Sequence, residues 1–307
     1  MGILVIGATF VDIKGFPFDN YLPTGRNAGK VEYVHGGVAR NVVEDIANVE
    51  LRPTFLSIVD DTPMGDAVIK KLNNHKVNTD YVLTRPDGMG TWLAVFDNNG
   101  DVAGSISKRP NMYPIAELLE EKGDEIFSQV PSVVLEVGLD KEIIKGTLSL
   151  AKKHNVKTFA LVANMSIAAE RRDLLQQFDC VICNQQEAGI LFLDDYEDKS
   201  PEEMREILAE RIVAANIPSM VVTMGGEGAV YANLQGETGV CPARKVQVKD
   251  TTGAGDSFCA GVAIGMTYGK TMAEAVEIGT TLAASVITSS ENVCPRFRPE
   301  EFGLGQK

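Results

Sequence analysis

Residues 250–258 read Asp-Thr-Thr-Gly-Ala-Gly-Asp-Ser-Phe, and this glycine-rich stretch decides the fold. Residues 246–248 before it alternate Val-Gln-Val, as a strand does, and an apolar, helix-like stretch follows it. A strand, a glycine turn and a helix in this order form an anion-binding site, because glycines let backbone N–H groups converge and the helix N-terminus adds roughly half a positive charge. We therefore expect the backbone at Gly253, Ala254 and Gly255 to hold a phosphate group.

Asp256 follows this turn and would stand just inside the start of the helix. The field of the helix N-terminus would keep its carboxylate ionised, so that it can accept the proton of a hydroxyl whose oxygen attacks phosphorus. A weak base suffices, because phosphoryl transfer depends chiefly on positioning. The alternative interpretation is a plain glycine turn in which Asp256 only caps the helix.

The rest of the chain alternates short apolar runs with amphipathic stretches. Residues 3–6 and 54–59 are of the first kind, and between them Val42, Ile46 and Val49 place one apolar stripe on a helix over 38–49. Further strands are expected over 133–135, 158–162, 180–183 and 220–223, and further helices over 65–74, 141–153 and 201–215. Such alternation predicts an α/β fold with a mainly parallel sheet covered by helices.

Two segments interrupt this alternation. Residues 14–35 are rich in Gly, Pro and Asn, and residues 89–110 contain a hairpin signal in which the strand 91–96 turns at Asp97-Asn98-Asn99-Gly100 and returns. Small strands inserted into an α/β sheet can cover a site at the carboxyl ends of the parallel strands. We expect both insertions to form a lid on a single domain that spans residues 1–307.

The composition excludes several classes of protein. The 307 residues carry a formal charge of −13, so the summed field of the protein repels nucleic acid and anionic membranes. No apolar stretch reaches the roughly 18–20 residues that a membrane-spanning helix needs. Five cysteines are an odd number in a long chain, and they fit a reducing, cytoplasmic setting better than a disulfide-rich secreted domain.

The glycine stretch 250–258 and a second motif together resemble a known family. Residues 36–41 read Gly-Gly-Val-Ala-Arg-Asn, and both motifs, in this order, resemble the signatures of the PfkB/ribokinase family of carbohydrate and nucleoside kinases. The resemblance extends from about residue 3 to about residue 300. It implies a ribokinase-like α/β fold with helices on both faces of the sheet and an inserted β-sheet lid. It also implies transfer of the γ-phosphoryl group of ATP to a primary hydroxyl, with Mg²⁺ and in several relatives K⁺, and a homodimer formed through the lid.

The family pattern assigns substrate roles to matching positions. Asp12 would accept hydrogen bonds from sugar hydroxyls, the turn at Gly36 and Gly37 would let the backbone approach the substrate, and Asn41 would supply both a donor and an acceptor. Taken alone, Asp12 could equally be a turn residue at the end of a strand.

Further matching positions concern the nucleotide and the ions. Glu187, in an Asn-x-x-Glu motif with Asn184, would act on Mg²⁺ through water, although the same spacing forms an ordinary capping box at a helix start. The family places Thr223, Gly225 and Gly228 near ATP, yet these glycines could mark a tight hairpin. Thr252 would also lie at the nucleotide. The backbone carbonyls of Asp250 and Thr252 match positions that bind a monovalent cation in several relatives.

Details of the motifs bear on the substrate. Residues 27–30, 36–41 and 96–100 are more similar to pseudouridine kinases than to ribokinases, which favours the 5′-hydroxyl of pseudouridine. A ribokinase, a fructokinase or a sugar-phosphate kinase is the alternative, and a non-catalytic sugar- or nucleoside-binding regulator ranks lower because Asp256 and the glycines are present.

The sequence also departs from the family pattern at two places. Val162 and Ala163 replace the Asp-Pro of many relatives near the phosphate path, which leaves the handling of metal open. Lys108 and Arg109 follow the hairpin where an acidic residue is common. They are either a solvated basic pair or a contact to the phosphate of a phosphorylated sugar.

Overall fold

The computed structural model describes residues 2–162 and 169–305. Its main sheet has nine strands in the order β13-β12-β11-β10-β9-β8-β1-β4-β5. The strands from β11 to β5 are parallel, and β12 and β13 continue the sheet antiparallel at one edge. These strands are β1 (Leu4–Ile6), β4 (Thr54–Val59), β5 (Asn78–Thr84), β8 (Ser132–Glu136), β9 (Lys157–Leu161), β10 (Cys180–Asn184), β11 (Ser219–Thr223), β12 (Ala229–Asn233) and β13 (Thr238–Cys241).

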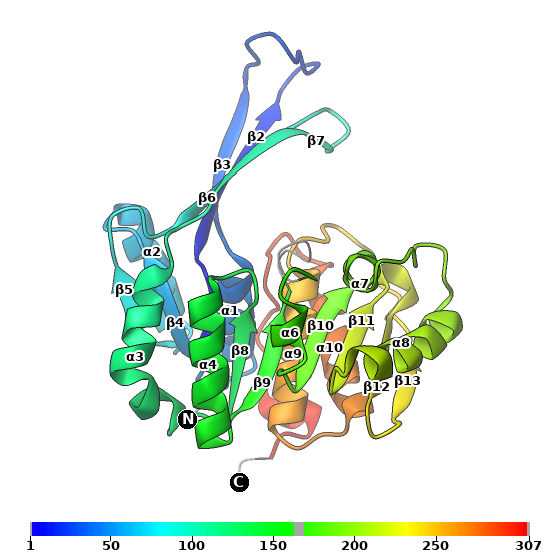
Figure 1. The fold of residues 1–307 in the computed structure, drawn as a ribbon. Coiled ribbons are helices and arrows are strands. Elements are labelled where there is room, and N and C mark those ends of the chain that lie inside the picture. Colours follow the sequence, from blue (N-terminus) through cyan, green and yellow to red (C-terminus); the bar gives the residue numbers. More distant parts are fainter. Residues whose placement is uncertain (1, 163–168, 306–307) are drawn as a thin grey trace.

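Helices cover both faces of this sheet (Figure 1). One face carries α1 (Val38–Asn48), α2 (Pro63–Asn74), α9 (Ala254–Thr267) and α10 (Met272–Val286). The other carries α3 (Tyr113–Phe127), α4 (Lys141–His154), α6 (Arg172–Leu175), α7 (Gln185–Phe192) and α8 (Pro201–Ala215). Two short 3₁₀ helices, η1 (Gly225–Glu227) and η2 (Pro299–Phe302), complete the elements. None of the helices in the described ranges is long and apolar enough to cross a membrane.

The sheet is buried on both faces because its strands are apolar throughout. In β1 the side chains of Leu4 and Ile6 enter the cluster under α3 and α4, whereas Val5 enters the cluster under α1 and α9. Alternate side chains of a strand point to opposite faces, so a continuous apolar run supplies both cores. This explains why the short runs 3–6 and 54–59 are reliable strand signals.

The two insertions form a separate four-stranded sheet, in the order β3-β2-β6-β7. It consists of β2 (Phe10–Pro17), β3 (Gly29–Gly36), β6 (Gly90–Phe96) and β7 (Val102–Lys108). Both hairpins are antiparallel, and β2 pairs with β6 in parallel. This sheet projects beyond the main body as a lid (Figure 1), which confirms the predicted ribokinase-like architecture. The first lid hairpin begins at Phe10, four residues earlier than expected.

One expected strand is missing and several elements were not foreseen. Residues 246–248 alternate in type but belong to no strand, and Val246 and Val248 are exposed in the loop that connects β13 to α9. The strand β5, the helices α3 and α10, and the edge strands β12 and β13 gave no clear periodic signal. α10 is apolar on most of its surface because it packs closely on α9, where Gly261 faces Gly279.

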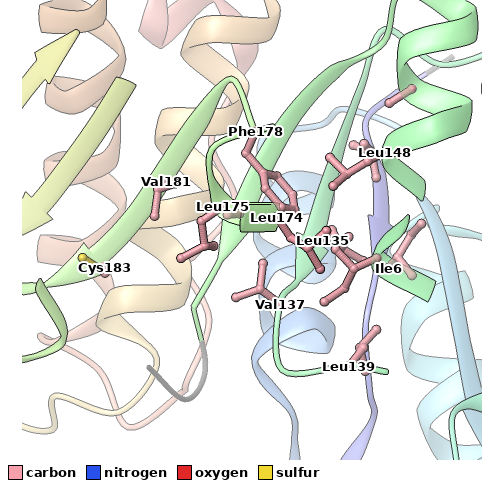
Figure 2. Close-up of a cluster of buried hydrophobic side chains, with 14 of the residues drawn as sticks. Ile6, Leu135, Val137, Leu139, Leu148, Leu174, Leu175, Phe178, Val181 and Cys183 are labelled. Carbon is pink, nitrogen blue, oxygen red and sulfur yellow. The ribbon is translucent and has the colours of Figure 1, made fainter. Parts of the chain in front are cut away.

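The residues directly before β10 pack into a cluster of aromatic and aliphatic side chains. Figure 2 shows Leu174, Leu175 and Phe178 beside Leu135 and Val137. Phe178 is fully buried in this cluster although no regular strand or long helix carries it. Its burial fixes the entry into β10, at whose carboxyl end two of the predicted site residues lie.

We expect Phe178→Ala to lower the free energy of unfolding by about 3–5 kcal/mol, because it leaves a cavity in a packed core. The matched control is Phe18→Ala, since Phe18 is 72% exposed and its loss should change stability by no more than about 0.5 kcal/mol. Urea unfolding followed by fluorescence measures both. Equal midpoints for the two variants would contradict this account of the core.

Candidate active site

Three of the four predicted substrate residues, Asp12, Gly37 and Asn41, meet Asp256 in one cavity of about 710 Å³ between the lid and the carboxyl ends of the parallel strands, called here the lid cavity; Gly36 does not line it. Open α/β sheets bind ligands at this edge. The lining residues come from β2, α1, the lid strands β6 and β7, the segments after β7 and β8, and the start of α9. They are Ala8, Phe10, Asp12, Gly37, Val38, Asn41, Trp92, Ser107, Arg109, Pro110, Met112, Glu136, Gly138, Leu139, Asp140, Thr252 and Asp256.

Asp256 and Asn41 form the centre of the cavity. The Asn41 amide donates from Nδ2 to Asp256 Oδ2 over 2.6 Å, although the two residues lie 215 positions apart in the sequence. Asn41 Oδ1 is buried and has no hydrogen-bond partner in the described structure. A buried acceptor without a donor is costly unless a ligand supplies one. The cavity is therefore complete only with a hydroxyl or N–H group at this point.

Burial raises the pKa of Asp256 from its ordinary 3.8 to about 7. The hydrogen bond from Asn41 and the Arg40 charge oppose the rise in pKa, whereas the carboxylates of Glu136 and Asp12 add to it. A carboxylate with a pKa near 7 is a much better proton acceptor than an exposed one. The sequence predicts that the helix field keeps this group ionised, but burial has the larger effect on its pKa.

Asp12 points across the diglycine turn. A Cβ atom added at Gly36 would lie 2.5 Å from Asp12 Oδ1, so only glycine leaves room for this carboxylate. Gly37 has φ +96° and is the residue before α1, where a side chain would collide with the carbonyl of Ala8. Burial raises the pKa of Asp12, while Lys14 and Arg40 lower it. Gly37 is therefore required by a close backbone contact, whereas Gly36 leaves space for the Asp12 side chain.

Glu136 is a site residue that the sequence analysis missed. It ends β8, and its Oε2 accepts a hydrogen bond from the Ala8 N–H over 2.9 Å. Burial raises its pKa, the Ala8 bond lowers it, and the nearby Arg109 guanidinium lowers it further. The sequence signal that could have identified Glu136 is a carboxylate at the carboxyl end of a buried parallel strand.

The glycine turn has the geometry of an anion site. Gly253 has φ +81° and a Cβ there would meet the Asn292 carbonyl at 2.1 Å, whereas a Cβ at Gly255 would meet nothing within 4 Å. No side chain caps α9, which begins at Ala254. Open space therefore lies in front of an uncapped helix N-terminus, which fits a phosphate group.

Asp250 and Thr252 flank this turn. Asp250 Oδ1 accepts a hydrogen bond from the Thr252 N–H over 2.8 Å. Burial raises the pKa of Asp250, but this bond and others outweigh the burial and lower it overall. Thr252 also lines the lid cavity, so the turn borders the substrate residues directly.

A second cavity, of about 950 Å³, contains three of the positions predicted for the nucleotide. Asn184 and Thr223 are paired neighbours at the ends of β10 and β11, and Gly225 follows them. Gly228 does not line this cavity. It has φ +104°, and a Cβ there would lie 2.1 Å from the Cys241 carbonyl, so the hairpin from β11 to β12 accounts for this glycine.

The capping box considered for Asn184 and Glu187 is present. The Glu187 N–H donates to Asn184 Oδ1 over 2.7 Å, and the Asn184 N–H donates to Glu187 Oε2 over 2.8 Å. Burial raises the pKa of Glu187. The structure thus explains this pair by helix capping, and an action of Glu187 on Mg²⁺ stays a prediction. Residues 2–162 and 169–305 hold no cluster of three or more His, Cys, Asp or Glu placed to bind a metal.

The departures from the family pattern have different outcomes. Lys108 forms an exposed ion pair with Asp87 over 2.7 Å, whereas Arg109 lines the lid cavity. The basic pair is therefore split between surface and site. Val162 packs against the core on one face of the sheet, and Ala163 lies outside the described residues.

A lidded α/β sheet with a buried carboxylate beside an uncapped glycine turn is the architecture of ribokinase-like kinases, and this is the class that fold and site define. The chain belongs to the pfkB family: the family model described as pfkB family carbohydrate kinase matches residues 2–294.

Similar proteins include kinases of nucleosides and of sugars. The chain is 35% identical to a guanosine-inosine kinase of Exiguobacterium acetylicum over 94% of this chain and 95% of that protein. It is 27% identical to a pseudouridine kinase of Escherichia coli K12, over 89% and 86% of the two chains. The structure of Arabidopsis thaliana ribokinase complexed with ribose and ATP matches with a TM-score of 0.83 at 18% identity and covers 99% of both chains, which shows the shared fold.

The two glycines of the turn should respond differently to alanine. We expect Gly253→Ala to destabilise the protein by about 1–3 kcal/mol, because it strains the backbone at φ +81° and collides with Asn292. Gly255→Ala adds a methyl group in open space within a helix, and its stability should equal or slightly exceed that of the wild type. Thermal unfolding compares them, and a Gly253→Ala protein as stable as Gly255→Ala would contradict the turn geometry.

Proposed function

We propose that this protein transfers the γ-phosphoryl group of ATP to the 5′-hydroxyl of a nucleoside, with guanosine and inosine as first candidates and pseudouridine as the second. The lining of the lid cavity carries the proposal: carboxylates surround the place of the hydroxyls, and Phe10, Trp92 and Met112 offer apolar surfaces to a flat base. The 35% identity to a guanosine-inosine kinase, against 27% to a pseudouridine kinase, supports this order of candidates.

The charges of the cavity favour a neutral substrate over a sugar phosphate. Asp12, Glu136, Asp140 and Asp256 line it, and among the described residues of its lining Arg109 is the one cation. A phosphate bound to the substrate would face four carboxyl groups, whereas hydroxyl and N–H groups would donate to them. A ribokinase or fructokinase activity is compatible with these charges but leaves the aromatic part of the lining unused.

In the proposed reaction Asp256 accepts the proton of the primary hydroxyl as its oxygen bonds to the γ-phosphorus. The bond from that phosphorus to the bridging oxygen breaks, and ADP leaves. Asn41 orients Asp256 through Nδ2 and offers Oδ1 to a substrate hydroxyl. The N–H groups at Gly253 and Gly255 would donate to the phosphate and stabilise its charge. The Ala254 N–H, which was expected to join them, donates to the Thr251 carbonyl over 3.2 Å. Mg²⁺, when bound with ATP, would neutralise further phosphate charge, with Glu187 as the candidate carboxylate.

Three further expectations belong to this proposal. Asn184, Thr223 and Gly225 would hold the nucleotide, and the carbonyls of Asp250 and Thr252 would hold K⁺. Homodimerisation through the lid also stays a prediction; large apolar side chains on the lid sheet are exposed, among them Val31, Tyr33 and Ile106, which supports a partner on that face.

The deciding measurement is ADP release with Mg²⁺–ATP across guanosine, inosine, adenosine, pseudouridine, uridine, ribose, fructose and fructose phosphates. We expect the highest kcat/KM with guanosine or inosine. A sugar or sugar phosphate as the best substrate would refute the nucleoside assignment, and no turnover with any compound would favour the non-catalytic regulator.

Asp256→Asn serves as the blank of this assay, with turnover lowered by about 10²–10⁴ and ATP binding retained. The variant should fold at least as stably as the wild type. The raised pKa means that the Asp256 carboxyl costs stability as the pH rises from 3.8 past about 7, and Asn removes that cost. Full turnover by a folded variant would remove Asp256 from its role.

The pH dependence follows from the same group. Asp256 must be ionised to accept a proton, and its pKa of about 7 means that half of the free enzyme is active at that pH. We expect kcat/KM to rise roughly tenfold per unit as the pH increases toward 7 and to level above it. Steady-state rates between pH 5.5 and 9 measure this limb. A level profile down to pH 5.5 would show that the proton acceptor is a group with an ordinary carboxyl pKa.

A further inference from the structure

Two side chains of opposite charge line the lid cavity without a role in the proposed reaction. Arg109 follows the lid strand β7, and Asp140 is the residue before α4. Asp140 makes no side-chain cap to its own helix, and Arg109 has no ion-pair partner within the residues that the structure describes. Both residues are exposed, so a guanidinium and a carboxylate that line one cavity are accessible to a ligand.

These two groups match one kind of base edge. A 6-oxopurine presents the acceptors O6 and N7 and, beside O6, the donor N1–H. A guanidinium binds O6 and N7 with two hydrogen bonds, and a carboxylate accepts from N1–H. Adenine keeps the N7 acceptor, but it has a donor at N6 in place of O6 and an acceptor at N1. Arg109 would then lose one of its two acceptors to a donor, and Asp140 would meet an acceptor.

The positions of the two residues suit this task. Arg109 follows β7 of the lid sheet and precedes Pro110, whereas Asp140 follows β8 of the main sheet and comes after Leu139. These two apolar neighbours line the cavity as well. Arg109 is near enough to Glu136 to lower the pKa of that carboxyl, although burial has the larger and opposite effect. The adjacent Lys108 forms an ion pair with Asp87 at the surface. Of these two cations, Arg109 is therefore the one that lines the cavity.

We propose that Arg109 and Asp140 bind the edge of the base and make the enzyme select 6-oxopurine over 6-aminopurine nucleosides. This inference rests on the proposed nucleoside kinase function. It predicts a preference that comes from two named side chains and leaves phosphoryl transfer itself to Asp256 and the glycine turn.

The test compares kcat/KM for inosine, guanosine and adenosine in the wild type, Arg109→Met and Asp140→Asn. Arg109→Met keeps the length of the side chain and removes the donors, so kcat/KM for inosine and guanosine should fall about 10- to 100-fold while that for adenosine changes little. Asp140→Asn should lower the ratio of inosine to adenosine about tenfold. The matched controls are Lys108→Met and Glu142→Gln, a neighbouring cation and a neighbouring carboxylate outside the cavity, which should keep the wild-type ratio.

A substrate analogue separates base recognition from general damage. 7-Deazaguanosine lacks the N7 acceptor, so the wild type should phosphorylate it with a lower kcat/KM than guanosine. The difference in kcat/KM should be smaller for Arg109→Lys and should vanish for Arg109→Met. An unchanged inosine-to-adenosine ratio in both variants, or an equal loss for all nucleosides, would overturn the inference and leave the nucleoside kinase function standing. Wild-type protein that phosphorylates sugars but no nucleoside would overturn both.

Discussion

The hydrogen bond between Asn41 and Asp256 is the contact on which the site depends. It joins the first turns of α1 and α9, the two helices that follow the glycine turns at each end of the chain. The buried carboxylate of Asp45 adds two further hydrogen bonds next to this contact. Ser257 Oγ donates to Asp45 Oδ2 over 2.7 Å, and the Cys294 N–H donates to Asp45 Oδ1 over 2.6 Å. Because every one of these groups is wholly or partly buried, the two helices keep one relative position, and with it Asp256, the proposed proton acceptor, keeps its place.

A buried ion pair extends this arrangement to the base of the lid. Arg40 is 1% exposed and forms a 2.6 Å pair with Glu44 one turn along α1, and Lys71 of α2 approaches the same carboxylate. The Arg40 guanidinium also donates to the carbonyls of His35 and Gly36, where β3 ends. A buried pair contributes little net stability, but it is costly to break and it fixes geometry. Here it fixes the diglycine turn and the end of the lid strand to α1.

The sequence predicted the elements whose signal is local and left out what depends on packing. Residues 201–215 form α8 as predicted. Its capping Ser200, its first residue Pro201 and the four-residue spacing of Met204, Leu208 and Ile212 are all local features. Residues 246–248 show the opposite case: alternation alone does not make a strand when no neighbouring strand pairs with it. Asp12, Asn41 and Asp256 could be named from motifs. Arg109 was left between a surface role and a site role, and Glu136 was missed, because only the fold places the end of β8 and the end of β7 at one cavity. The motif alone suggested a nucleotide role for Gly228, whereas the hairpin requires a glycine at this position in any case.

The carboxyl groups of the cavity explain how substrate binding and stability are connected. Burial raises the pKa of Asp12, Glu136 and Asp256, so their charged forms are less stable in the free protein than in water. A substrate that brings hydroxyl and N–H donors removes this penalty, and it also supplies the partner that Asn41 Oδ1 lacks. Part of the binding free energy would therefore come from relief of this unfavourable arrangement of polar groups in the cavity. The same penalty gives Asp256 a pKa near 7, so the burial that destabilises the free protein also makes this carboxylate basic enough to accept a proton at neutral pH.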